Sequence, residues 1–253
     1  MGRRRKITLL AVGCLLVIAV LAWLNRPRDE PARATVEDAV RSFRAENDSG
    51  ERRGAVGPAH GVYRYATQGS ESVKTAFVGA THDYDGTSTI ALSAGRCGER
   101  ERWQVLSGRW SEAEACESPD GEASATVIEF HEFFGQGQED SLRCRSSPVS
   151  EKPGARFSSS CKSEDFSISN RSRVVGIERV SVGEETFDAT HVETRSTFGG
   201  ENSGTATRGE WRRRSDGLLL RRSVASEADT SAGGGSHYSE RYTIRLLSVT
   251  PRR

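Results

Sequence analysis

Residues 238–249 read YSERYTIRLLSV, and this stretch decides the fold class. In it Tyr242, Ile244 and Leu246 alternate with Thr243 and Arg245. Successive side chains of a β-strand point to opposite faces of the sheet, so the alternation predicts a strand. Short runs of the same texture, rich in Val, Thr, Tyr and Phe and separated by Gly, Ser, Asp and Asn, fill residues 62–228. The sequence therefore predicts an antiparallel, mainly β domain over residues 62–253.

The alternate face of these runs is polar. Many runs carry Arg, Glu, Ser or Thr at every second position, which is typical of a sheet with one face on the core and one in water. We therefore expect an antiparallel curved sheet or half-barrel over a single core. The segment TVEDAVRSFRAEND predicts one short helix before the sheet, because Thr35 can cap it and its apolar residues recur on one helical face.

The N-terminus predicts a membrane anchor. Four cationic residues at positions 3–6 precede an uncharged run, which at about 1.5 Å per helical residue matches a hydrocarbon core of ~30 Å. The cationic block is expected to stay cytoplasmic, which places the protein in the cell membrane as a single-pass protein. The expected organisation is a cytoplasmic tail (residues 1–6), a transmembrane anchor (7–24), a stalk, short helix and linker (25–61) and an extracytoplasmic β domain (62–253).

Two other interpretations of the N-terminus stay open. A secretory signal peptide could be cleaved after Ala22, although such signals have a shorter apolar region of about 7–15 residues. A lipoprotein could be acylated at Cys14, but the apolar run continues well beyond that cysteine. Retention of the segment as an anchor is the interpretation that the sequence favours.

The four cysteines outside the predicted anchor indicate two disulfides. An even count in an oxidising compartment is typical of a disulfide framework. We expect the pairs Cys97–Cys116 and Cys144–Cys161, because each brackets one candidate hairpin. Zinc is the competing interpretation, but no C-x-x-C spacing occurs and no histidine lies at ligand spacing. No metal and no cofactor are therefore expected.

The charge balance argues against nucleic acid as a partner. Lys and Arg number 36 and Asp and Glu 35, so no global positive field favours a polyanion. The oligomeric state is left open by the sequence.

The sequence contains no assembled catalytic set. The histidines form no H-E-x-x-H motif, and neither G-x-S-x-G nor S-x-x-K occurs. His82 is expected in a polar turn and His191 in a strand as a structural histidine. His131 beside Glu132 is the least poor candidate for acid–base chemistry. No catalytic residue is assigned.

An arginine-rich hairpin is the most visible candidate binding site. Trp211, Arg212 and Arg214 precede a turn, and Arg222 follows it. If the two arms pair, two or three guanidinium groups share one face, where arginine offers forked donors to anions. We expect these four residues to bind an anionic envelope lipid or polymer. The alternative is a solvated strand whose arginines pair with neighbouring Glu.

Two stretches carry a resemblance to known proteins. The first joins TVEDAVRSFRAEN and GVYRYATQGSESV to His82, Tyr84, Cys97, Trp103, Arg109 and Cys116, and the second joins VGEETFDATHVETRSTFGG to GEWRRRSDGLLLRRSV. Together they resemble uncharacterised actinobacterial single-span membrane proteins with an extracytoplasmic β domain, and distantly the periplasmic lipoprotein-carrier-type half-barrels. The resemblance implies a fold and a compartment rather than an activity. The strands here are more polar than the concave face of such carriers.

The expected function is non-enzymatic binding of an envelope ligand or protein partner by a membrane-anchored extracytoplasmic β protein. Two alternatives remain: an envelope hydrolase whose site forms only in three dimensions, and a structural subunit of a membrane complex.

Overall fold

The computed structural model describes residues 31–47, 57–117, 123–147, 150, 152–230 and 235–253. The predicted tail and anchor, residues 1–24, lie outside this part of the chain. None of the helices that are described has both the length and the apolar character needed to cross a bilayer.

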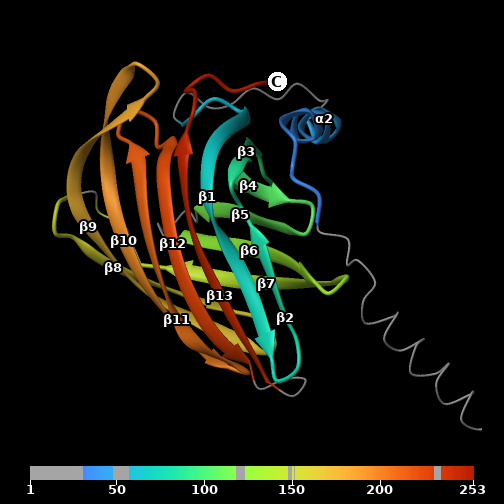
Figure 1. Ribbon diagram of the computed structural model, residues 1–253. Coiled ribbons are helices and arrows are strands. Elements are labelled where there is room, and N and C mark those ends of the chain that lie inside the picture. The colour runs from blue at the N-terminus through green and yellow to red at the C-terminus, as the bar shows by residue number, and fades with distance from the viewer. Residues whose placement is uncertain (1–30, 48–56, 118–122, 148–149, 151, 231–234) are drawn as a thin grey trace, which may run out of the picture. The chain divides into compact units, whose positions relative to one another are not determined.

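A single antiparallel sheet of thirteen strands makes up nearly all of the described chain (Figure 1). Strands that follow one another along the chain are neighbours almost throughout, and β13 also pairs with β1. The strands are β1 (Gly61–Thr75), β2 (Gly79–Asp83), β3 (Gly86–Ala94), β4 (Gly98–Leu106), β5 (Arg109–Glu117), β6 (Ala123–Phe133), β7 (Gln136–Ser146), β8 (Arg156–Lys162), β9 (Phe166–Val182), β10 (Glu185–Gly200), β11 (Asn202–Arg213), β12 (Leu219–Thr230) and β13 (Ser236–Leu246).

The β1–β13 pairing closes the sheet into a barrel. The register runs from Tyr65 opposite Leu246 to Thr75 opposite Ser236. All thirteen strands except β2 form the closed ring, so the barrel has twelve strands and one extra. The prediction of a mainly β, antiparallel fold is confirmed, but the expected half-barrel is corrected to a closed barrel. Closure pairs the two end strands of the twelve-stranded ring, whose edges would otherwise be templates for aggregation, and β2 pairs with β1 alone.

A glycine in β1 explains why β2 is separate from β3. The two strands pair with successive parts of the same edge of β1. Between them Gly69 has a φ of 138°, and a Cβ there would collide with the carbonyl oxygen of Arg241. The freed backbone of Gly69 accepts a hydrogen bond from the N–H of Tyr84 at 2.8 Å. Glycine thus permits the kink at which the neighbouring strand is interrupted.

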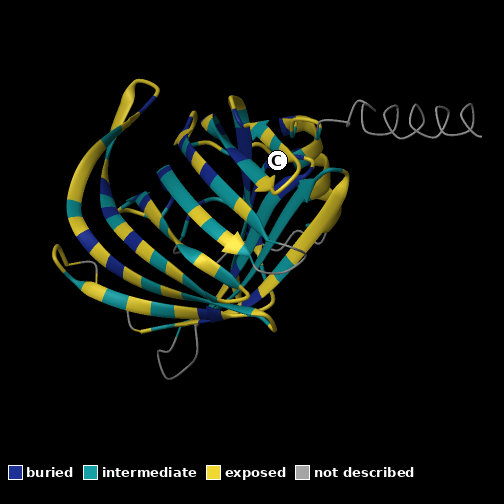
Figure 2. Ribbon diagram, turned by 60° about the horizontal axis from the view of Figure 1, so that its bottom comes forward, coloured by how far each residue is buried: buried dark blue, intermediate teal, exposed yellow. Residues whose placement is uncertain are grey.

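Aromatic rings fill one side of the barrel interior. Trp103 stacks on Tyr242 with ring centroids 4.7 Å apart, and Tyr84 meets both rings edge-on. Buried and exposed residues alternate along the long strands, as Figure 2 shows for β9 and β10. A barrel of about eight strands is just filled by ordinary side chains, so twelve strands need large rings and charged groups inside.

Helix α2 (Val36–Glu46) packs on the outside of the barrel. Its buried Val36 and Val40 contact Val62 of β1, with Ala91 of β3 beside them. The predicted cap is confirmed: the Thr35 hydroxyl accepts a hydrogen bond from the backbone N–H of Asp38 at 3.1 Å. A helix of this length is marginal alone, so the docked face and the cap together stabilise it.

Replacing Thr35 with Ala is expected to lower the free energy of unfolding by about 1 kcal/mol, because the Asp38 amide loses its acceptor. Urea unfolding followed by circular dichroism measures the loss. Thr35→Ser keeps the hydroxyl and serves as the matched control. An equal loss in both variants would show that the methyl group, and not the cap, matters at this position.

Both predicted cysteine pairs are present as disulfides. Cys97–Cys116 closes the β4–β5 hairpin, and Cys144–Cys161 joins directly opposed residues of β7 and β8. The second pair is buried and packs with Leu142 in a separate apolar cluster. In the chain-entropy view, each bridge of this loop length stabilises by about 3 kcal/mol.

Candidate functional site

The four residues predicted to bind a ligand do not share one face. Arg212 and Arg222 point into the barrel from β11 and β12, whereas Trp211 points outward. Arg214 lies exposed after β11, where its backbone N–H donates to the carbonyl of Asp188 at 3.0 Å. Because strand side chains alternate, consecutive residues of an arginine run go to opposite sides of the wall.

The two inward arginines belong to a closed ring of charges. Arg222 donates to Glu101 at 2.6 Å and to Glu210 at 2.7 Å. Arg212 donates to the same two carboxylates at 3.2 and 3.4 Å. Burial alone would raise the pKa of Glu210, but the two guanidinium groups hold it well below its usual range. Two cations and two anions neutralise one another here, so the ring is satisfied internally and offers little charge to a ligand.

A second buried network centres on Glu71 of β1, whose side chain is fully buried. Its carboxylate lies 3.1 Å from Nδ1 of His82 and 2.9 Å from Nδ1 of His131. The Tyr238 hydroxyl donates to it at 3.2 Å, and Nε of Arg109 lies 3.7 Å away. Burial would raise the pKa of Glu71, but these partners lower it to about 2. The carboxylate is therefore ionised and satisfied from four other strands.

Arg109 links Glu71 to a further buried carboxylate. Its Nε donates to Glu240 at 3.0 Å, and the Tyr84 hydroxyl donates to Glu240 at 2.8 Å. The arginine also lies over the Trp103 ring, 5.1 Å from its centroid. The network thus joins β1, β2, β5, β6 and β13 through the interior.

The structure does not bring His131 and Glu132 together. His131 faces inward, and its carboxylate neighbours are Glu71 and, at 3.9 Å, Glu129. Burial and Arg109 would lower the pKa of His131, but these two carboxylates raise it. A histidine held in a saturated ion-pair network resembles a structural charge centre more than a general base. His82 lies in β2 and not in a turn, while His191 lies in β10 as predicted.

Trp211 is part of a covered stack on the face of β11 opposite to Glu210, and it belongs to the same buried apolar cluster as Ala189 and Leu219. Its ring lies parallel to His191 with centroids 4.0 Å apart, and the Arg221 guanidinium lies 4.4 Å from its centroid on β12. Glu178 of β9 accepts hydrogen bonds from the indole and approaches His191, both at 2.7 Å. Only 8% of Trp211 is exposed, so the ring has little surface left for a ligand.

Sequence reasoning missed a larger group of cations on the outside of β7–β10, here named the basic face. Its members alternate with buried residues such as Cys144, Cys161, Val174 and Thr194, and all of them are exposed. The basic face consists of Arg143 and Arg145 (β7), Arg156 and Lys162 (β8), Arg171 and Arg173 (β9) and Arg195 (β10).

Like charges meet directly across the basic face. One carboxylate, Glu193 of β10, lies opposite Arg173. At the other positions residues of like charge are opposed: Arg143 and Lys162, Arg156 and Arg173, and Arg171 and Arg195. Such pairs are destabilising in a sheet. None of the seven side chains forms an ion pair with another residue in the part of the chain that is described. The signal in the sequence was the period-2 placement of basic and hydroxyl residues in RFSSSCK and SNRSR.

Cys97, Glu114 and Cys116 form the one group of metal-ligating side chains close enough to share an ion among the described residues. The two sulfur atoms are joined as a disulfide, and Glu114 accepts hydrogen bonds from the backbone N–H groups of Arg96 and Cys97. These three residues therefore form a disulfide beside a turn whose backbone N–H groups are hydrogen-bonded to Glu114.

Comparison of the chain with protein-family models finds no match. Comparison with curated proteins and with solved structures likewise finds none.

Proposed function

We propose that the chain is a non-enzymatic binding protein of the cell envelope, whose basic face binds a linear anionic polymer. The observation that carries the proposal is the set of three directly opposed cation pairs, none of whose members forms an ion pair among the described residues, although Glu193 lies opposite Arg173. Other arginines of this protein, such as Arg109, Arg212, Arg213 and Arg222, are paired with carboxylates. An arrangement that weakens the sheet is explained if an external anion neutralises it.

The spacing of the basic face suits a polymer with repeated charge. Neighbouring strands lie about 4.8 Å apart, and residues on one face of a strand recur about every 6.7 Å, so the cations form a regular lattice. Serine hydroxyls of Ser158, Ser160 and Ser169 share this outward parity and supply hydrogen bonds between the charges. Guanidinium forks bind phosphate, sulfate or carboxylate groups in two-point fashion.

Curvature favours a polymer over a bilayer. The outer wall of a closed barrel is convex, so a flat lipid surface meets few of the seven cations at once, whereas a flexible chain follows the wall. The outward positions next to these cations hold Ser160, Ser169, Thr197 and Glu193. None of these neighbours is aromatic, so base stacking on single-stranded nucleic acid has no platform beside the cations.

The envelope location rests on three supports. Two disulfides are typical of an oxidising compartment. The predicted anchor at residues 7–24 and the resemblance to extracytoplasmic actinobacterial proteins and carrier-type half-barrels point the same way. In this proposal the ligand binds the basic face and not the hairpin site of Trp211, Arg212, Arg214 and Arg222 that the sequence predicted.

We expect the triple variant Arg171→Gln/Arg173→Gln/Arg195→Gln to weaken binding of long-chain polyphosphate by about tenfold or more, because three cation–phosphate contacts are lost. Each lost contact should also reduce the magnitude of the slope of log affinity against log salt concentration by about 0.7. The measurement is fluorescence anisotropy of labelled polyphosphate with the full-length chain in non-ionic detergent. Titrations at several salt concentrations give the slope.

The matched control replaces three exposed arginines elsewhere, Arg41, Arg241 and Arg245, with Gln and makes the same change in net charge. Equal losses in the two triple variants would mean that net charge, and not the basic face, governs binding. Preferential binding to phosphatidylglycerol vesicles over polyphosphate would replace the polymer with a lipid surface.

A further inference from the structure

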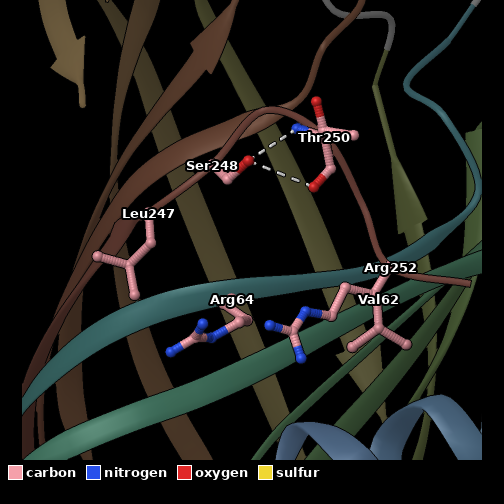
Figure 3. Close-up of a pocket in the computed structure, with 6 residues that line it drawn as sticks. All are labelled: Val62, Arg64, Leu247, Ser248, Thr250 and Arg252. Atoms are coloured by element: carbon pink, nitrogen blue, oxygen red, sulfur yellow. Dashed lines mark hydrogen bonds between the residues drawn. The ribbon is translucent and has the colours of Figure 1, made fainter. Parts of the chain in front are cut away.

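A small cavity of about 230 Å³ lies outside the barrel wall, between β1 and the segment that follows β13 (Figure 3). Two residues of β1 and four of the C-terminal segment line it: Val62, Arg64, Leu247, Ser248, Thr250 and Arg252. Neither β1 nor the C-terminal segment belongs to the basic face.

The path of the C-terminal segment creates the cavity. The N–H of Leu247 donates to the carbonyl of Arg64 at 2.9 Å, and Arg252 exchanges two backbone hydrogen bonds with Val62 at 2.8 and 2.9 Å. Between these two attachments the chain bows away from β1. The bow is fixed internally, because the Ser248 hydroxyl accepts from the backbone N–H of Thr250 at 3.2 Å and donates to the carbonyl oxygen of Thr250 at 3.4 Å (Figure 3).

The charge of the cavity is positive. Nε of Arg64 is buried and has no hydrogen-bond partner, and Arg64 forms no ion pair with any residue described. Arg252 pairs with Glu37 at 3.3 Å, but that carboxylate is 72% exposed. An exposed ion pair of this kind is screened by solvent and exchanges readily. Two arginines therefore line one cavity, and the carboxylate paired with them is the exposed Glu37 on Arg252.

We propose that this cavity is a binding site for a phosphate group, held between the Arg64 and Arg252 guanidiniums, toward which the Ser248 hydroxyl would turn the proton that it donates to the Thr250 carbonyl. A buried guanidinium donor without an acceptor is unfavourable, and a phosphate oxygen supplies the acceptor. The forked donors of arginine match tetrahedral and planar oxyanions. The volume exceeds that of a single water, which takes up about 30 Å³ in the liquid, and accommodates phosphate with a small attached group.

The test uses inorganic phosphate as the probe. The full-length chain in non-ionic detergent is titrated with sodium phosphate against sodium chloride at equal ionic strength, by isothermal titration calorimetry. Saturable one-site binding by the wild type is expected. Arg64→Gln should weaken it by at least about tenfold because the two-point contact is lost, and Arg64→Lys should weaken it as well, because an ammonium keeps the charge without the fork.

Arg245→Gln on β13 is the matched control, since it removes an exposed arginine near the cavity that does not line it. Wild-type binding that is absent at millimolar phosphate, or that survives unchanged in both Arg64 variants, overturns the proposal. Loss in Arg245→Gln equal to that in Arg64→Gln also overturns it. Circular dichroism establishes that each variant is folded, and Ser248→Ala provides a second lesion that leaves the charges intact.

The basic face and the cavity are distinguished by testing each site's variant for binding of the other site's ligand. The triple basic-face variant should keep phosphate binding in the cavity, and Arg64→Gln should keep polyphosphate binding. Failure of one proposal therefore leaves the other standing.

Discussion

Glu71→Gln is expected to lower the free energy of unfolding by about 3–5 kcal/mol at pH 7, the range for removing one partner from a buried ion-pair network. The neutral amide removes the nearest carboxylate of His82 and His131, while Arg109 keeps Glu240 at 3.0 Å. Urea unfolding followed by tryptophan fluorescence reports the loss, because Trp103 lies beside this network.

The pH dependence of the same variant gives an independent check. The pKa of Glu71 is lowered to about 2 in the folded protein, against about 4.3 for a free glutamate. A depressed folded pKa contributes stability that is present above the unfolded pKa and is lost as pH falls toward the folded value. The stability difference between wild type and Glu71→Gln should therefore shrink between about pH 4.3 and pH 2.

Glu227→Gln is the matched control, since Glu227 is exposed on β12, carries the same charge and lies opposite the uncharged Thr205 and Ser239. It should change stability by no more than about 0.5 kcal/mol. A loss below about 1 kcal/mol in Glu71→Gln, or a difference from wild type that stays constant down to pH 2, would contradict the assignment of Glu71 as an ionised charge centre.

Arg222→Met is expected to cost about 3–5 kcal/mol, because Glu101 and Glu210 then face each other with Arg212 as their one remaining guanidinium in the ring. Methionine keeps much of the side-chain volume, so the loss reports charge rather than a cavity. The measurement is again urea unfolding. Adding Glu210→Gln to Arg222→Met should recover part of the loss, since it removes the carboxylate left without a partner.

The neighbouring residue supplies the control for Arg222. Arg221→Met removes an outward guanidinium whose contact is the Trp211 ring, and such a cation–π contact contributes about 1 kcal/mol. A larger loss in Arg221→Met than in Arg222→Met would show that the inward and outward assignments on β12 are reversed.

Local pattern was enough to predict the elements. The alternation around Ile244, the cap at Thr35 and the bracketed hairpins of the cysteines are properties of neighbouring residues, and the structure has all three. Closure of the sheet could not be predicted in this way. An open and a closed sheet share the same alternation, and the difference is one pairing between residues 65–75 and 236–246.

The candidate sites depend on contacts between residues far apart in the sequence more than the strands and the helix do. Glu71 appears in the sequence as one more polar strand residue, because its partners His131 and Tyr238 are 60 and 167 positions away. The arginine run at 212–214 was visible, but alternation alone does not say which face is inside. The basic face needed both the outward parity of each strand and the knowledge that β7–β10 are adjacent.

Closure by β1 and β13 also governs how the chain reaches its native state. Every other pairing in the ring joins strands close in the sequence, so the wall can grow hairpin by hairpin as the polypeptide emerges. The β1–β13 pairing cannot form until β13 has been synthesised. Until then β1 and the most recently synthesised strand each have an unpaired hydrogen-bonding edge. If translation stops before residue 236, or if a protease removes β13, the sheet is nearly complete but has two unpaired strand edges that can pair with other chains.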